Sequence, residues 1–155
     1  MRWLLDSVIL IDHFNGIGPA TRFIAEEAID IALSPVTRAE VLTGFTDEHR
    51  PLAAELLDQF PTLAITAAEA DLAAGLRRSE GWRLPDALQA AVARHNELDL
   101  VTRNTKDFPP ERYDFVTVPY VVAPPGVAVP SRDTSAREDS RGNDGLSAGS
   151  GETPR

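Results

Sequence analysis

Four stretches of the sequence place a carboxylate or an amide at the boundary of a predicted element. These side chains belong to Asp6, Glu40, Asp86, and the pair Asn104 and Asp107. Ligands of open α/β sheets gather at the carboxyl ends of the strands, so oxygen-bearing side chains at such boundaries are well placed for chemistry. Hard cations such as Mg²⁺ prefer oxygen ligands and usually keep water together with one or two carboxylates.

A cluster of carboxylates predicts a bound cation, because without one the acids repel each other. Two unit charges about 4 Å apart repel by roughly 4 kcal/mol at an effective dielectric constant of about 20. A divalent ion reverses that sign, and it also activates water and stabilises the charge of a phosphodiester transition state. The chain contains no cysteine and no paired histidines, which excludes a typical zinc site.

Each of these side chains also has a structural explanation that the sequence leaves open. Asp6 is a good N-cap for a following helix. Glu40 is either a solvated helical residue or the partner of Thr37 in a capping box. Asp86 suits the first turn of a helix because of the helix dipole. The polar pair that follows the fourth strand suits a turn.

The elements that must position these side chains alternate between strand and helix. Short apolar runs predict strands at residues 3–5, 30–33, 63–65, 98–101 and 115–118. Helices are predicted at residues 19–28, 35–45, 51–60, 66–80 and 84–95, whereas residues 8–14 fit both helical and strand spacing. This alternation predicts an α/β domain with a parallel sheet covered on both faces.

The composition changes near residue 123. Of the 32 residues from 124 to 155, 14 are Gly, Pro or Ser and none is aromatic. Such a segment cannot bury enough apolar surface to offset the entropy lost on ordering. We therefore expect one folded domain over residues 1–123 and a disordered Gly/Pro/Ser-rich tail over residues 124–155.

The charge and hydropathy of the chain limit its partners. A formal net charge of −9 argues against a broad basic surface for nucleic acid, although carboxylates neutralised by cations remain compatible with nucleic acid chemistry. No apolar stretch approaches the length of about 18 residues that a membrane span needs, and the N-terminus lacks a signal-peptide pattern. We expect a soluble, cytoplasmic protein.

Four motifs together resemble the PIN-domain ribonucleases, and in particular the VapC-like toxins of bacterial toxin–antitoxin pairs. The motifs are LLDSVILID (residues 4–12), SPVTRAEVLTGF (34–45), LPDALQAA (84–91) and LVTRNTKDF (100–108). The resemblance covers about residues 1–120. It implies a three-layer domain in which helices flank a short central parallel sheet.

The resemblance also implies an endoribonuclease that depends on Mg²⁺ or Mn²⁺. Asp6, Glu40 and Asp86 match the three acids of the family that bind metal. Many members carry a fourth acid at the position of Asn104, whose carbonyl oxygen is still a possible ligand. Asp107 matches another acidic position of the family, so either of the two completes the catalytic site.

Several further residues gain expected roles from their place in these motifs. Many members have Asn where this chain has Val8, so a polar contact is expected to be missing there, and Ser7 is the neighbour expected to support the site. Arg38, Arg103 and Lys106 lie beside the acids and are candidates for binding RNA phosphates, or else are solvated surface cations.

The resemblance implies an RNA substrate, a homodimer, and a cognate antitoxin that inserts an Arg-bearing segment into the acidic site. One alternative is a PIN-like module that binds RNA or protein without cleavage, suggested by Asn104 and Val8. A second is a phosphatase with Asp6 as nucleophile, which the chain disfavours because such enzymes usually carry an acid at the position of Val8.

Overall fold

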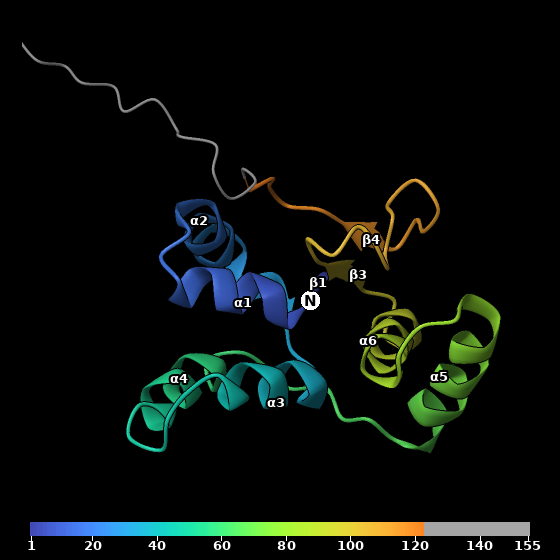
Figure 1. The fold of residues 1–155 in the computed structure, drawn as a ribbon, viewed down its shortest axis with the longest axis horizontal. Coiled ribbons are helices and arrows are strands. Elements are labelled where there is room, and N and C mark those ends of the chain that lie inside the picture. Colours follow the sequence, from blue (N-terminus) through green and yellow to red (C-terminus); the bar gives the residue numbers. More distant parts are fainter. Residues whose placement is uncertain (123–155) are drawn as a thin grey trace, which may run out of the picture. The chain divides into compact units, whose positions relative to one another are not determined.

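The computed structural model describes residues 1–122, which contain a four-stranded parallel sheet. Its strands are β1 (Trp3–Leu5), β2 (Ile31–Ala32), β3 (Asp99–Val101) and β4 (Val116–Thr117), in the order β2-β1-β3-β4. Figure 1 labels β1, β3 and β4 among them. Leu4 of the central strand β1 pairs with Ala32 on one side and with Leu100 on the other. The predicted parallel sheet is confirmed, whereas the tail predicted over residues 124–155 lies outside the described residues.

Helices connect β1 to β2 and β2 to β3, whereas residues 102–115 join β3 to β4 without a helix. The helices are α1 (Ser7–Phe14), α2 (Gly18–Glu27), the short 3₁₀ helix η1 (Ala28–Asp30), α3 (Pro35–Thr43), α4 (Arg50–Leu57), α5 (Ala67–Glu80) and α6 (Leu84–His95). Residues 8–14, which fit two spacings in the sequence, are therefore helical. Of the helices within residues 1–122, none combines the length and apolar character that crossing a membrane requires.

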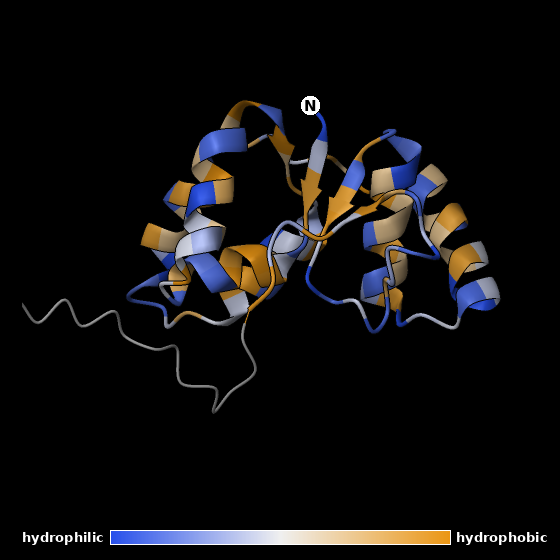
Figure 2. Ribbon diagram, turned by 90° about the horizontal axis from the view of Figure 1, so that it is seen from above, coloured by the Kyte–Doolittle hydropathy of each residue, from blue (hydrophilic) through white to orange (hydrophobic). Residues whose placement is uncertain are grey.

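The sheet separates two hydrophobic clusters, which gives the domain three layers. Because side chains alternate along a strand, Leu4 and Leu100 pack on one face, against residues of α5 and α6. Leu5 and Val101 pack on the opposite face, against residues of α1, α2, α3 and α4. Figure 2 shows the two groups of helices on either side of the apolar strands. The predicted three-layer α/β architecture is confirmed.

Local sequence signals set the helix boundaries. The Ser34 hydroxyl caps α3 by accepting a hydrogen bond from the Thr37 backbone N–H at 3.1 Å. Thr66 and Glu69 form a capping box at the start of α5. Gly81 follows α5 at a φ of 74°, a left-handed conformation that favours glycine.

The strand predicted at residues 63–65 is wrong. Thr62 forms only an isolated parallel bridge with Leu33, supported by a 2.8 Å hydrogen bond from the Leu63 N–H to the Leu33 carbonyl. Because Ser34 already caps α3, the chain after Leu33 turns into a helix and offers no further strand backbone for pairing.

Candidate functional site

The carboxyl ends of the parallel strands bring the predicted side chains to one edge of the sheet. Asp6 follows β1 directly, and Thr102 follows β3. Leu33 and Ser34 lead from β2 into α3, the helix that carries Glu40. Because β1 lies between β2 and β3, Asp6 occupies the middle of this edge, where ligands of open α/β sheets gather.

Asp6 is the N-cap of α1 and also the centre of a buried hydrogen-bond network. Its Oδ1 accepts from the Ser7 backbone N–H at 2.9 Å and from Gln89 Nε2 at 3.2 Å. Its Oδ2 accepts from the Thr102 hydroxyl at 2.7 Å. Asp6 is only 8 % exposed. The capping explanation is therefore correct and leaves room for a second role, because contacts from three elements hold the carboxylate in place.

Glu40 extends from α3 into solvent close to the other acids. Desolvation by the surrounding protein raises the pKa of Glu40, the negative charges of Asp6 and Asp86 raise it further, and the Ser7 hydroxyl acts in the opposite direction. The capping box with Thr37 does not form, because the cap of α3 is Ser34. Glu40 thus faces an acidic environment instead of stabilising its own helix terminus.

Asp86 lies in the first turn of α6, as the sequence predicts, and is half-buried. Burial raises the pKa of Asp86 most, the charges of Asp107 and Asp6 raise it further, and Arg83 lowers it. The helix dipole favours a carboxylate at this position, so both explanations of Asp86 hold together. The structure brings Asp6, Glu40, Asp86 and Asp107 into one electrostatic neighbourhood.

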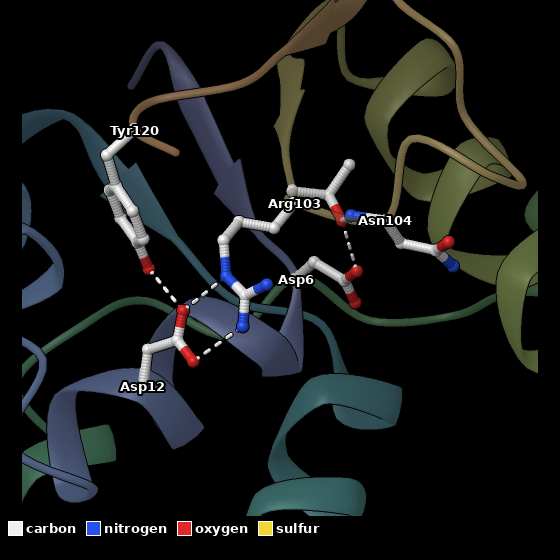
Figure 3. Close-up of polar contacts among 6 residues, drawn as sticks. Asp6, Asp12, Arg103, Asn104 and Tyr120 are labelled. Atoms are coloured by element: carbon white, nitrogen blue, oxygen red, sulfur yellow. Dashed lines mark hydrogen bonds and ion pairs between the residues drawn. The ribbon is translucent and has the colours of Figure 1, made fainter. Parts of the chain in front are cut away.

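Asn104 and Asp107 form a turn and bind each other. Asn104 Nδ2 donates to Asp107 Oδ2 at 2.9 Å, and the Asp107 backbone N–H donates to Asn104 Oδ1 at 3.3 Å. The Asn104 amide points away from Asp6 in Figure 3. Only Asp107 of this pair acts on the pKa of Asp86, so the charge of Asp107 reaches the acidic neighbourhood.

Arg103 makes a bidentate ion pair with Asp12 of α1 (Figure 3). Its Nε and Nη2 donate to the two carboxylate oxygens of Asp12 at 2.6 and 2.8 Å. The Tyr120 hydroxyl donates to the same carboxylate at 2.8 Å. These bonds occupy two of the three guanidinium nitrogens of Arg103, which leaves Nη1 as the group available to a phosphate.

The other predicted polar contacts differ in exposure. Arg38 forms a surface ion pair with Asp58 at 2.8 Å, whereas Lys106 is exposed beside Asp107. Ser7 is buried next to Asp6. Its backbone N–H donates a hydrogen bond to Asp6, and its hydroxyl lowers the pKa of Glu40 by hydrogen bonding.

Sequence reasoning missed several buried polar residues beside Asp6. Gln89 and Thr102 lie within the motifs named above, but the sequence predicts no function for either. For Thr37 the sequence predicts only a capping box with Glu40. Each of them is fully buried and hydrogen-bonded. The available signal was Gln89 itself, a polar residue in the alanine-rich segment that packs on the sheet.

The donor set suits a hard divalent cation, although the acids do not form a preassembled cage. Asp6, Glu40 and Asp86 offer carboxylate oxygens, which are the ligands that such a cation prefers. Among the groups that shift the pKa values of Glu40 and Asp86, Arg83 is the only cation. Within residues 1–122, however, no three acidic, histidine or cysteine side chains are arranged closely enough to hold a metal ion. The acids act on one another through their charges, which raise the pKa values of Glu40 and Asp86 in addition to burial.

Comparisons with known proteins agree with this geometry. Residues 3–114 match the family model described as the PIN domain. A toxin–antitoxin complex from Klebsiella pneumoniae contains a chain of 33 % identity with a TM-score of 0.71, and the match covers 78 % of this chain and 100 % of that one. No curated protein matches the sequence.

Two more distant structures share the fold. FitAcB from Neisseria gonorrhoeae is 20 % identical with a TM-score of 0.63, covering 76 % of this chain and 98 % of that one. VapBC2 from Rickettsia felis, bound to a DNA fragment from its promoter, is 21 % identical with a TM-score of 0.63, covering 75 % and 96 %.

Proposed function

This chain belongs to the PIN domain family, and from that premise we propose that it is a divalent-metal-dependent endoribonuclease and the toxin of a toxin–antitoxin pair. One observation carries the proposal. Asp6, Glu40 and Asp86 come from separate parts of the fold, yet their carboxylates act on one another at the carboxyl edge of the sheet. Burial raises the pKa values of Glu40 and Asp86 most, and the charges of neighbouring acids, Asp6 among them, raise both values further.

Asp6, Glu40 and Asp86 are the proposed ligands of Mg²⁺, or of Mn²⁺ in its place. A bound ion of this kind supplies activation of water and stabilisation of charge on the phosphodiester. Asp107 completes the catalytic site in preference to Asn104, because its charge acts on Asp86 whereas the Asn104 amide is committed to Asp107. Asn104 then orients the Asp107 carboxylate.

The remaining polar residues have supporting roles in this proposal. The Ser7 and Thr102 contacts hold the Asp6 carboxylate in one orientation. Exposed Lys106 and the Nη1 group of Arg103 offer positive charge to RNA phosphates at the same edge. Arg38 shares its charge with Asp58 and contributes less.

The toxin role rests on the matched chain from Klebsiella pneumoniae, which belongs to a toxin–antitoxin complex. We propose that a cognate antitoxin inhibits this protein by inserting a positively charged segment at the acidic edge. A homodimer and a cytoplasmic location belong to the same proposal. Co-expression with the product of the adjacent gene tests it: a stable complex with lost cleavage supports the antitoxin, and undiminished cleavage contradicts it.

Cleavage of total cellular RNA tests the enzymatic proposal. The wild type and Asp6→Asn are each incubated with Mg²⁺ or with a chelator, and the new RNA ends are mapped by sequencing. We expect discrete cuts only for the wild type with Mg²⁺. Cleavage that survives both the chelator and the substitution contradicts the metal site. RNA binding without cleavage, unchanged in Asp6→Asn, favours the alternative of a binding module.

A further inference from the structure

Gln89 is a buried polar side chain on the face of α6 that packs against the sheet. It is 1 % exposed, and Ala90, Ala91 and Val92, which follow it, are fully buried. A buried amide is costly unless its hydrogen-bonding groups find partners. The partners of Gln89 therefore show why a polar residue is tolerated at this position.

The Gln89 amide has a single consistent orientation. Its Nε2 donates to Asp6 Oδ1 at 3.2 Å and to Thr37 Oγ1 at 2.6 Å, and its Oε1 accepts from the Ser34 hydroxyl. A carboxylate oxygen only accepts hydrogen bonds, so the NH₂ group must face Asp6. If the amide were flipped, its oxygen would face the Asp6 carboxylate, and neither of these two acceptors could donate a hydrogen bond to the other.

Two further bonds extend this network to β1 and to the start of α3. The Ser34 hydroxyl accepts from the Thr37 backbone N–H at 3.1 Å, and the Thr37 hydroxyl donates to the Leu5 carbonyl at 2.8 Å. No buried side-chain nitrogen or oxygen of the described residues lacks a partner. A fully satisfied buried network of this kind rigidifies the elements that it joins.

The network joins the same three elements that carry the proposed metal ligands. Asp6 follows Leu5 on the chain and is bonded to Gln89 directly. Asp86 precedes Gln89 by three residues on α6, and Glu40 follows Thr37 by three residues on α3, a spacing that places each pair on one side of its helix. The hydrogen bonds that hold Gln89 and Thr37 in place therefore also hold the helix backbone that carries Asp86 and Glu40.

Gln89 also supplies a contact that the sequence predicts to be missing. Val8 packs partly buried against the apolar cluster of α1 to α4, and position 8 therefore offers no polar contact to the acids. The amide that donates to Asp6 comes instead from α6, which packs on the other face of the sheet from α1.

We propose that Gln89 is a positioning residue, which orients the Asp6 carboxylate as a ligand for a divalent cation and holds together the helices that carry Glu40 and Asp86. This inference rests on the proposed function of the site. Groups that orient metal ligands typically contribute about 10–100-fold to metal affinity. The expected effect of losing the Gln89 amide is of that size and falls on metal binding before it falls on RNA binding.

Binding of Mn²⁺ alone, followed by calorimetry or by electron paramagnetic resonance, tests the inference without RNA. Gln89→Met keeps the side-chain volume and removes the three hydrogen bonds. Asn96→Ala is the matched control, because it removes only the bond from Asn96 to the Val92 carbonyl at the far end of α6. We expect Mn²⁺ affinity to fall about 10-fold or more in Gln89→Met and to stay at the wild-type value in Asn96→Ala.

A milder variant keeps the test decisive if Gln89→Met does not fold. Thr37→Val removes one acceptor of Gln89 and the bond to the Leu5 carbonyl, but it leaves the bond from Gln89 to Asp6, so we expect a smaller loss of Mn²⁺ affinity. In cleavage assays, Gln89→Met should raise the Mn²⁺ concentration needed for half-maximal rate, leave the KM for RNA unchanged, and recover much of kcat in excess Mn²⁺. A merely structural defect would not show this separation.

The outcomes separate the inference from the proposed function. If Gln89→Met binds Mn²⁺ with the affinity of the wild type, the positioning role is overturned and the proposed function is unaffected. A wild type that binds no Mn²⁺ contradicts the proposed function and this inference with it. Equal losses in Gln89→Met and Asn96→Ala also overturn the inference, because they assign the effect to helix stability.

Discussion

The Asp6 carboxylate combines the two roles that its position predicts. It caps α1, and three donors from the Ser7 backbone, Gln89 and Thr102 hold its oxygens. A carboxylate accepts about four hydrogen bonds, so one direction remains for a ligand. The cap was predictable from the residue type alone. The metal role stays a prediction. It is supported by the pKa values of Glu40 and Asp86, which burial raises most and which the charge of Asp6 raises further.

These raised pKa values predict that Glu40→Gln and Asp86→Asn stabilise the metal-free protein. The folded-state pKa of each acid lies above its unfolded value, so the metal-free fold loses stability as the pH rises through the folded pKa. A neutral amide removes this cost. We expect the Tm of each variant without metal to exceed that of the wild type by a few degrees at pH 7, as thermal unfolding in a chelator would measure.

Addition of Mg²⁺ should reverse the order of these Tm values. The wild type gains stability from binding, whereas the variants lose a ligand and gain less. Glu55→Gln on the exposed face of α4 is the matched control and should change neither value. Variants that melt below the wild type in the chelator would show that the acids do not repel one another.

The pair of Asp12 and Arg103 ties α1 to the loop after β3, and Tyr120 ties the segment after β4 to the same carboxylate (Figure 3). Hydrogen bonds from Arg103 hold the pKa of Asp12 below its ordinary value, although burial opposes the shift. Asp12 is 4 % exposed, so its bonds are shielded from solvent. This arrangement positions Arg103 and, through it, the chain that carries Thr102 and Asn104.

Asp12→Asn should therefore destabilise the fold by about 1–3 kcal/mol at neutral pH, because it removes the negative charge that faces Arg103 and replaces one acceptor oxygen with an NH₂ donor. The folded pKa of Asp12 lies below the unfolded value, so its contribution is complete above the ordinary pKa of 3.8 and is lost as the pH falls through the folded pKa. Urea unfolding of both proteins from pH 7 downward measures the difference. A difference that persists unchanged at the lowest pH would contradict the assignment to this ion pair.

The elements predicted correctly are those specified by neighbouring residues. The apolar run of β1, the capping box at Thr66 and the glycine that ends α5 all act within a few residues. The strand expected at residues 63–65 failed because its pairing depends on how far β2 extends, which Ser34 decides. The contacts of the site are also distant in the sequence: 83 residues separate Gln89 from Asp6, and 91 separate Arg103 from Asp12. Local patterns carry no information about such pairs.

The net charge of the whole molecule means that cations must neutralise its acidic edge before RNA can bind there. The net charge of −9 belongs almost entirely to residues 1–123, since the tail holds four basic and five acidic residues. An acidic domain approaches a polyanion such as RNA only if cations neutralise its acidic edge. The sheet places that edge at the carboxyl ends of its strands, where the proposed metal ligands meet.

Truncation tests the extent of the functional domain. A chain that ends at residue 122 keeps Tyr120 and its bond to Asp12, whereas a chain that ends at residue 118 loses them. We expect the first truncation to melt at the full-length temperature and to cleave RNA at the full-length rate. The second should melt lower. A first truncation that unfolds or loses cleavage would assign a role to residues 123–155 and contradict the predicted domain boundary.

The chemistry of the RNA ends is the most direct test of the central claim, that carboxylate-bound metal activates water to hydrolyse RNA. Attack by water leaves a phosphate on one fragment and a hydroxyl on the other, whereas attack by the neighbouring 2′-hydroxyl leaves a 2′,3′-cyclic phosphate. With purified protein and a defined RNA, we predict open phosphate and hydroxyl ends in Mg²⁺, no cyclic phosphate, and no cleavage in a chelator or by Asp6→Asn. Cyclic phosphate ends that form in the chelator would contradict the account.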